Sequence, residues 1–253
     1  MISSDATVVT TIERPGYPSS GAQTDGRWNG LYRTGAVASL VTAIFIPIQI
    51  IAFIIWIPPD YNAIAKWFAV FHENAIGGLM RMDLLLMADY VLLIPIVLAL
   101  YVALYRRSPS LMVVAVALFF VSIAAYLASN TAFQMLLLSN HYASATTAAA
   151  RAPYVAAGQA MMATYQGTSF IAYYMLGSLA GMFAGIAMLR STSFSRAAAY
   201  AAIMGNGVGL ALYVPVVGIF LSVLSGAILW IWYFLVARDL WRLGQAGPGS
   251  ATG

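Results

Sequence analysis

The residues that could do chemistry lie close together in one short part of the chain. His72, Glu73, Arg81 and Asp83 come just before an apolar run, and Asp89 lies within that run. A carboxylate inside a membrane span is energetically costly, so such a residue is by default a functional-site hypothesis. Because the chain has only 8 acidic residues among 253, this group of charges is the strongest indication of a site.

The composition places these residues in a membrane protein. Hydrophobic residues make up 62% of the chain, charged residues make up 8%, and the mean hydropathy is +0.83. A soluble domain has about 25% charged residues. The net charge of +4 does not indicate nucleic-acid binding, because the basic residues lie at the ends of apolar segments. The absence of cysteine excludes disulfides, thiolate metal sites and cysteine nucleophiles.

Six apolar segments are long enough to cross the bilayer, which takes about 20 helical residues for a hydrocarbon core of roughly 30 Å. We predict an all-α polytopic bundle with spans at residues 36–56, 84–105, 111–138, 167–189, 197–214 and 216–236. Residues 31–243 therefore form one membrane domain. Residues 1–30 and 244–253 are polar and rich in small residues. We predict that they are disordered, because they cannot bury enough apolar surface to fold alone.

The distribution of lysine and arginine predicts that both termini are cytoplasmic. In that orientation nine basic residues lie inside, namely Arg14, Arg27, Arg33, Arg106, Arg107, Arg190, Arg196, Arg238 and Arg242. The outer side holds three, which are Lys66, Arg81 and Arg151. This bias follows the positive-inside rule and predicts a multi-pass protein of a plasma membrane.

Two long connections lie on the predicted outer side. Residues 58–82 carry apolar and aromatic side chains at helical spacing, namely Ile64, Trp67, Phe68 and Phe71. This pattern predicts a helix that lies at the outer surface or runs into the second span. Residues 139–166 are rich in alanine. We expect them to extend the fourth span outward, with Pro153 in a first helical turn.

Glycines recur every four residues in the fourth span, at Gly177, Gly181 and Gly185. Small residues at this spacing allow helix backbones to approach closely. The stripe could join two copies of the chain into a homo-oligomer, or it could pack helices within one bundle. The second use is the more common one in polytopic proteins.

Depth along the predicted helices separates the polar groups. Asp89 lies 17 residues before Arg106, hence roughly 25 Å from the inner boundary and several Å below the outer one. Gln49 lies roughly 10 Å below the outer end of the first span. Asn130 and Gln134 fall at the outer end of the third span. The polar groups thus gather on one side, which predicts an outward-facing vestibule formed by the first three spans.

Eight residues are candidates for ligand binding in this vestibule: Asp89, Arg81, Asp83, Glu73, His72, Gln49, Asn130 and Gln134. Arg81 and Asp89 point about 80° apart on one straight helix, so we expect the partner of Asp89 on another span, either Gln49, Asn130, Gln134 or a tyrosine. Asn206 alone falls near mid-membrane. The apolar inner half disfavours an ion pathway.

A metal site is not predicted. His72 and Glu73 lack HExxH spacing, because position 76 is Ile76. His141 lies on a distant outer segment and could join them only if the two connections met. No phosphate-binding loop, nucleophile elbow or dinucleotide fingerprint occurs, so no cofactor is expected.

Three functions remain open at this point. The first is a non-enzymatic protein that binds a lipid, a small lipophilic molecule or a partner in the vestibule, with membrane lipids around it. The second is a membrane-embedded enzyme that acts on a lipid-like substrate, with Asp89 and Glu73 as acid–base groups. A transporter is the weaker third choice, because the chain shows no clear internal repeat.

The order of motifs also resembles a known family. Arg81, Asp83 and Asp89 precede an apolar run that closes on Leu104-Tyr105 and Arg106-Arg107, a basic link runs from Arg190 to Arg196, and Tyr32-Arg33-Thr34-Gly35 opens the first span. This order is similar to that of a bacterial integral membrane family known as domain of unknown function 4386. The resemblance covers about Leu31 to Leu243 and implies a helical bundle without an assigned activity.

Overall fold

The computed structural model describes residues 26–214 and 216–245, and within these ranges the protein is entirely helical. The elements in chain order are η1 (Gly26–Trp28), α1 (Asn29–Ile55), α2 (Ile64–Glu73), α3 (Ala75–Arg81), α4 (Leu84–Leu104), α5 (Pro109–Ser129), α6 (Ala132–Ser144), α7 (Ala148–Tyr165), α8 (Thr168–Leu189), α9 (Arg196–Gly209), η2 (Leu210–Tyr213) and α10 (Gly218–Gln245). Most of the two predicted disordered segments lies outside the described residues. Residues 26–30 and 244–245 are helical, contrary to that prediction.

Five helical segments of the described ranges are long and apolar enough to cross a membrane. They are Gly26–Ile55, Leu84–Leu104, Pro109–Ser144, Ala148–Leu189 and Phe220–Gln245. Five of the six predicted spans overlap these segments. The remaining one, residues 197–214, forms α9 and η2 instead, and α9 has only 14 residues. At 1.5 Å per residue α9 is about 21 Å long, which is less than the roughly 30 Å of the hydrocarbon core.

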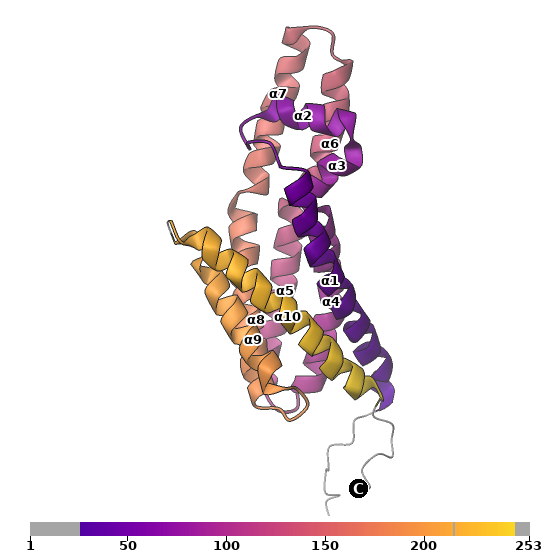
Figure 1. Ribbon diagram of the computed structural model, residues 1–253, viewed down its shortest axis with the longest axis vertical. Helices are drawn as coiled ribbons and strands as arrows, with labels where there is room; N and C mark the ends of the chain where they lie inside the picture. Colours follow the sequence, from indigo (N-terminus) through magenta and orange to yellow (C-terminus); the bar gives the residue numbers. More distant parts are fainter. Residues whose placement is uncertain (1–25, 215, 246–253) are drawn as a thin grey trace, which may run out of the picture.

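Six of the helices form a bundle, which consists of α1, α4, α5, α8, α9 and α10 (Figure 1). In this bundle α5 packs along α8, α1 packs along α4 and α10, and α9 lies against both α8 and α10. The Trp230 indole donates a hydrogen bond of 2.8 Å to the Ala43 carbonyl and so joins α10 to α1. Ile44, Ile51 and Phe220 are among the large apolar side chains exposed on its outside. Such a surface is suited to lipid.

The glycine stripe of α8 packs helices within this bundle. A Cβ atom at Gly177 would meet Ser122 of α5 at 2.8 Å, and a Cβ at Gly181 would meet the Asn206 side chain of α9. A Cβ at Gly185 would lie 3.0 Å from the Ala199 carbonyl oxygen, also on α9. The spacing of the glycines therefore serves close contacts with α5 and α9 of the same chain.

The remaining helices, α2, α3, α6 and α7, extend the molecule beyond one end of the bundle and are called the cap here (Figure 1). The apolar side chains of α2, including Trp67, Phe68 and Phe71, are each 1% exposed. They pack with residues of α6 and α7, among them Met135 and Met162. The predicted helix therefore forms, and its apolar side packs on protein. It does not run into the second span, because the helical backbone is interrupted after α2 and again between α3 and α4.

The long α7 continues the line of α8 into the cap, as the sequence predicted. It begins earlier than expected, however. Thr147 caps its first turn by accepting a hydrogen bond of 3.1 Å from the Ala150 amide, so Pro153 lies inside the helix. The third predicted span likewise continues into the cap, but its helix is interrupted at Asn130 and Thr131 between α5 and α6.

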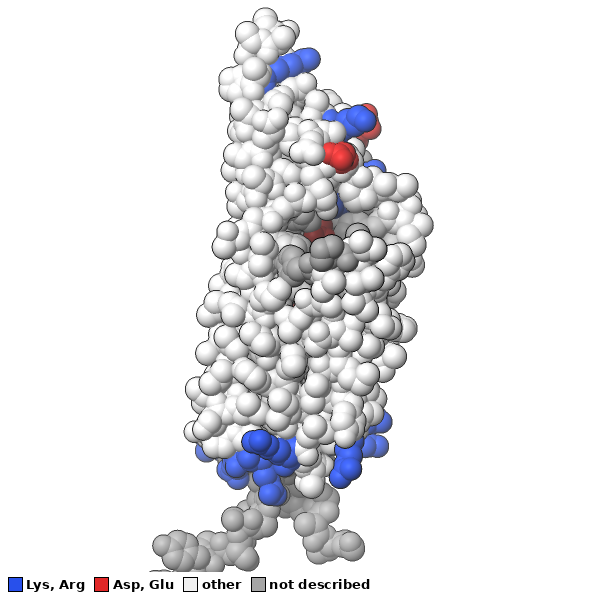
Figure 2. Space-filling view, turned by 90° about the vertical axis from the view of Figure 1, so that its left-hand side faces the viewer, with Lys and Arg blue, Asp and Glu red and all other residues white. Residues whose placement is uncertain are grey.

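The two ends of the molecule differ in charge. On the side drawn in Figure 2, the end opposite the cap carries basic side chains only, whereas the cap carries both signs. The start of α1 and the end of α10 meet at this basic end, because Arg33 Nε donates a hydrogen bond of 3.1 Å to the Gly244 carbonyl. Asp239 also lies there, buried and paired with Arg238 at 2.9 Å.

Candidate functional site

Polar side chains converge on the turn that connects α3 to α4. Gln49 of α1 donates a hydrogen bond of 2.9 Å from Nε2 to the Met80 carbonyl. Asn130 donates one of 3.0 Å from Nδ2 to the Met82 carbonyl. Asp83 accepts a hydrogen bond from the Tyr165 hydroxyl of α7. We call this set the polar clamp, and its members are Gln49, Met80, Met82, Asp83, Asn130 and Tyr165.

Asp83 has the unusual backbone conformation that this turn requires. Its φ of 62° lies in the left-handed region, which aspartate tolerates better than most residues. Burial raises the pKa of the Asp83 carboxyl to about 6, and the hydrogen bond from Tyr165 acts in the opposite direction. Burial and the nearby Asp83 charge also raise the pKa of the Tyr61 hydroxyl above its usual value. Asp83 therefore joins the cap to the first turn of α4.

Asn130 explains the interruption between α5 and α6. Its extended backbone ends α5, and its side-chain Oδ1 accepts a hydrogen bond of 3.1 Å from the Ala132 amide. Nδ2 donates a hydrogen bond to the Met82 carbonyl at the same time. The oxygen and the nitrogen of this buried side-chain amide are therefore both hydrogen-bonded to backbone groups. Three predicted ligand-binding residues, Gln49, Asp83 and Asn130, thus fix a turn of the chain.

Four other candidates lie outside the polar clamp and do not line a common site. His72, Glu73 and Gln134 are exposed to solvent or lipid, and Arg81 ends α3 with its Nε buried but not hydrogen-bonded to any described residue. His141 stacks on Tyr154 at a ring distance of 5.8 Å. Among the described residues, no three His, Cys, Asp or Glu side chains lie together as metal ligands would.

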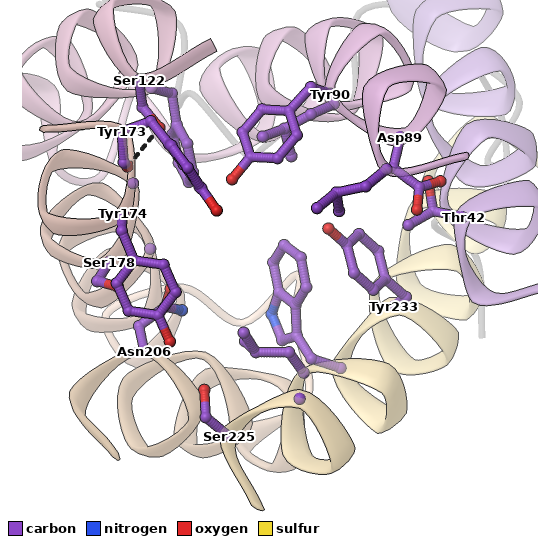
Figure 3. Close-up of a pocket in the computed structure, with 18 of the residues that line it drawn as sticks. Thr42, Asp89, Tyr90, Ser122, Tyr173, Tyr174, Ser178, Asn206, Ser225 and Tyr233 are labelled. Carbon is purple, nitrogen blue, oxygen red and sulfur yellow. Dashed lines mark hydrogen bonds between the residues drawn. The ribbon is translucent and has the colours of Figure 1, made fainter. Parts of the chain in front are cut away.

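A cavity of about 280 Å³ lies inside the bundle. It is lined by side chains of all six bundle helices, as the ring of ribbons in Figure 3 shows. Asp89 is the one predicted candidate that lines it. The cavity differs from the expected vestibule, because helices α8, α9 and α10 form much of its wall. Glu73 does not line the cavity, so the acid–base pair of the enzyme hypothesis is not assembled.

Asp89 lies on the second turn of α4, and its side chain is 6% exposed. The Thr42 hydroxyl of α1 lies beside its carboxylate, and the Tyr233 hydroxyl faces the hollow nearby (Figure 3). Asp89 Oδ1, Thr42 Oγ1 and the Trp232 indole Nε1 are buried and make no hydrogen bond of standard geometry with a described residue, although the Thr42 hydroxyl is close enough to interact with the Asp89 carboxylate. All three residues line the cavity. The expected partners Gln49 and Asn130 are instead used in the polar clamp.

Aromatic side chains form a second wall of the cavity. Tyr90 stacks on Tyr126 with ring centroids 4.1 Å apart, and Tyr173 meets their rings edge-on at 5.4 and 4.8 Å. Figure 3 shows Tyr90, Tyr173, Tyr174 and Tyr233 around the hollow. These tyrosines were not predicted as site residues. Only Tyr126 lies well inside a predicted span rather than near a span end, where tyrosine is usual, so the sequence offered little signal for the others.

Other polar side chains of the cavity wall are bonded to backbone. Ser122 donates to the Tyr173 carbonyl at 2.8 Å, Ser225 donates to the Gly205 carbonyl at 2.7 Å, and Asn206 donates to the Ala202 carbonyl at 2.7 Å. These bonds are of the kind that join membrane helices. The buried polar atoms of the wall that lack a hydrogen bond of standard geometry are therefore those of Asp89, Thr42 and Trp232.

Comparisons with family models, with curated proteins and with solved structures find no match to the chain. The resemblance to domain of unknown function 4386 therefore stays a prediction. The site geometry is the remaining guide to function.

Proposed function

We propose that this protein binds a small molecule in the cavity of its helix bundle. The observation that carries the proposal is a group of three buried polar atoms on one cavity, Asp89 Oδ1, Thr42 Oγ1 and Trp232 Nε1. Trp232 Nε1 has no partner among the described residues, and the other two have no protein partner beyond each other. A buried polar atom without a partner costs about 1–3 kcal/mol, so native proteins pair nearly all such atoms with protein, water or ligand. A ligand with matching groups would satisfy all three at once.

The size of the cavity supports a small molecule rather than a whole lipid. At the roughly 30 Å³ that one water occupies in the liquid, 280 Å³ holds about nine water-sized groups. A membrane phospholipid is several times larger than this. An enzyme is less well supported, because Glu73, the second acid–base group of that hypothesis, does not line the cavity with Asp89.

The topology that we propose has six spans, with both ends of the chain on the cytoplasmic side of a bacterial plasma membrane. The meeting of Arg33 with Gly244 supports an even number of crossings. In this topology α9 and η2 supply the sixth crossing, and their 18 residues span about 27 Å or slightly more. The basic end then faces the cytoplasm, and the cap lies outside.

Filling the cavity tests the proposed function. Gly226 of α10 lines the cavity, and a Cβ atom there would meet no atom within 4 Å. Gly207 of α9 has equally open space but does not line the cavity. Gly226→Phe and Gly207→Phe therefore both replace a helical glycine by the same residue, and only the first adds bulk at a position that lines the cavity.

We expect at least one class in a panel of neutral, cationic and anionic small molecules to raise the melting temperature of the purified protein in detergent. The same compound should protect Gly207→Phe and should not protect Gly226→Phe. If every compound acts equally on both variants, or none protects the wild-type protein, the cavity is not a binding site and the proposal is wrong.

A further inference from the structure

The chemistry of the cavity wall also indicates what kind of molecule enters. We propose that the ligand is a small protonated amine with a short apolar or aromatic body and a hydrogen-bond acceptor, whose ammonium group binds Asp89. This inference rests on the proposed function and narrows it to one class of ligand.

The first argument is charge. Asp89 is the only Asp, Glu, Lys or Arg side chain among the described residues that line the cavity. No arginine or lysine shares the site, and the one ion pair within the described residues, between Arg238 and Asp239, lies at the basic end. In a site of low dielectric constant a carboxylate without a cation attracts a cationic ligand and repels an anionic one.

The second argument is the match of hydrogen-bonding groups. The free Asp89 Oδ1 can only accept a hydrogen bond when ionised, which a protonated amine supplies and a quaternary ammonium does not. The Trp232 indole can only donate, so it needs an acceptor elsewhere on the ligand. The Thr42 hydroxyl can do either, and it lies beside Asp89 (Figure 3).

The third argument is the aromatic wall. Tyr90, Tyr173, Tyr174 and Tyr233 surround the hollow in Figure 3, and Trp232 and Phe119 also line it. The faces of such rings attract cations with an energy of about 0.5–2 kcal/mol and accommodate apolar groups equally well. An inorganic cation needs a close shell of oxygen ligands. A wide space walled by rings suits an organic cation better.

The test isolates the role of the ammonium group, apart from the acceptor that Trp232 would bind, with three probes of similar shape and different charge: 2-phenylethylamine, 2-phenylethanol and phenylacetate. Each is titrated by calorimetry into the purified full chain in lipid nanodiscs at neutral pH. The variants are Asp89→Asn, which removes the cavity carboxylate, and Glu73→Gln, which removes an exposed carboxylate outside the cavity. Sodium chloride alone serves as a fourth arm.

We expect the amine to bind the wild-type protein and Glu73→Gln alike, and to bind Asp89→Asn at least tenfold more weakly. The alcohol should bind more weakly than the amine and should not distinguish the variants. Phenylacetate should not bind. The melting temperature of Asp89→Asn is measured to check that the variant is folded. We expect it to be folded, because an amide has nearly the shape of the carboxylate and can still accept from the Thr42 hydroxyl.

The other outcomes overturn the inference in distinguishable ways. If the alcohol binds as tightly as the amine, or the amine binds Asp89→Asn undiminished, the cavity takes a neutral ligand and the proposed function survives without this inference. If sodium chloride alone binds the wild-type protein but not Asp89→Asn, and the amine does not bind, the ligand is an inorganic cation. If no probe binds and filling the cavity also has no effect, both proposals fail.

Discussion

The polar clamp and the bundle cavity contain the same kinds of residue, but the two regions use them differently. In the clamp, Gln49 and Asn130 donate to backbone carbonyls, and Asp83 accepts from a tyrosine hydroxyl. In the cavity, Asp89 and Thr42 are equally buried but have polar atoms without a hydrogen-bond partner. Each of these clamp residues makes at least one hydrogen bond, although Gln49 Oε1 makes none. Paired polar groups stabilise the fold, whereas a cluster of buried polar atoms without full partners around a cavity indicates a place for another molecule.

This difference also separates two kinds of membrane helix packing. The cap has a continuous apolar core in which Trp67, Phe68 and Phe71 are almost completely buried. The bundle also has an apolar core, which includes Leu100 and Leu240, but in addition it surrounds a hollow lined by tyrosine and serine side chains. A hollow in the bundle gives up dispersion contacts, and a bound molecule would restore them.

The largest effect should come from breaking the clamp. Replacing Asn130 by alanine removes the hydrogen bonds to Met82 and Ala132 and leaves buried backbone groups unpaired, which costs about 3 kcal/mol. For a chain of this size that lowers the melting temperature by roughly 6–12 °C. The measurement is thermal unfolding of the purified protein in detergent. Gln134→Ala is the control, because this exposed side chain lies one turn away. Equal melting temperatures for the two variants would contradict the structural role of the clamp.

A smaller effect should appear in the pH dependence of stability. Burial raises the pKa of Asp83 from 3.8 to about 6, so its contribution to stability is fully present below pH 3.8 and is lost as the pH rises through about 6. We expect a contribution on the order of 1 kcal/mol, because partial exposure of the side chain weakens the effect. Asp83→Asn keeps the left-handed turn and should flatten the curve of melting temperature between pH 4 and pH 7.

Glu73→Gln is the control for this series, because Glu73 is exposed at the end of α2. That variant should keep the wild-type slope. If the melting temperature of Asp83→Asn depends on pH as steeply as that of the wild-type protein, other groups dominate the pH dependence. Asp83 is then not the group of the clamp that titrates.

The smallest effect should come from the cavity. Thr42→Val keeps the shape of the side chain and removes a hydroxyl that makes no hydrogen bond with a described residue. We therefore expect the melting temperature without ligand to change by no more than about 2 °C, which corresponds to about 0.5 kcal/mol. A loss as large as that of Asn130→Ala would show that Thr42 is part of the structural framework, and the contrast between clamp and cavity would disappear.

The sequence by itself determined the helical class and the positions of five segments that could cross a membrane. A run of about 20 apolar residues is long enough to span the bilayer as a helix and is uncommon in soluble proteins. It also predicted the extension of the fourth span into α7, because alanine-rich segments favour helix. The spacing of Gly177, Gly181 and Gly185 indicated close packing, which the contacts with α5 and α9 show.

Only the tertiary structure decided which polar residues are paired. Gln49, Asn130 and Asp89 look alike in the sequence, since each is a polar residue near one end of an apolar run. Their roles differ because two of them reach the turn at Met80 and Met82, whereas the third faces a hollow that six helices enclose. Hydrogen bonds between residues far apart in the chain depend on helix rotation and crossing, which local patterns do not specify.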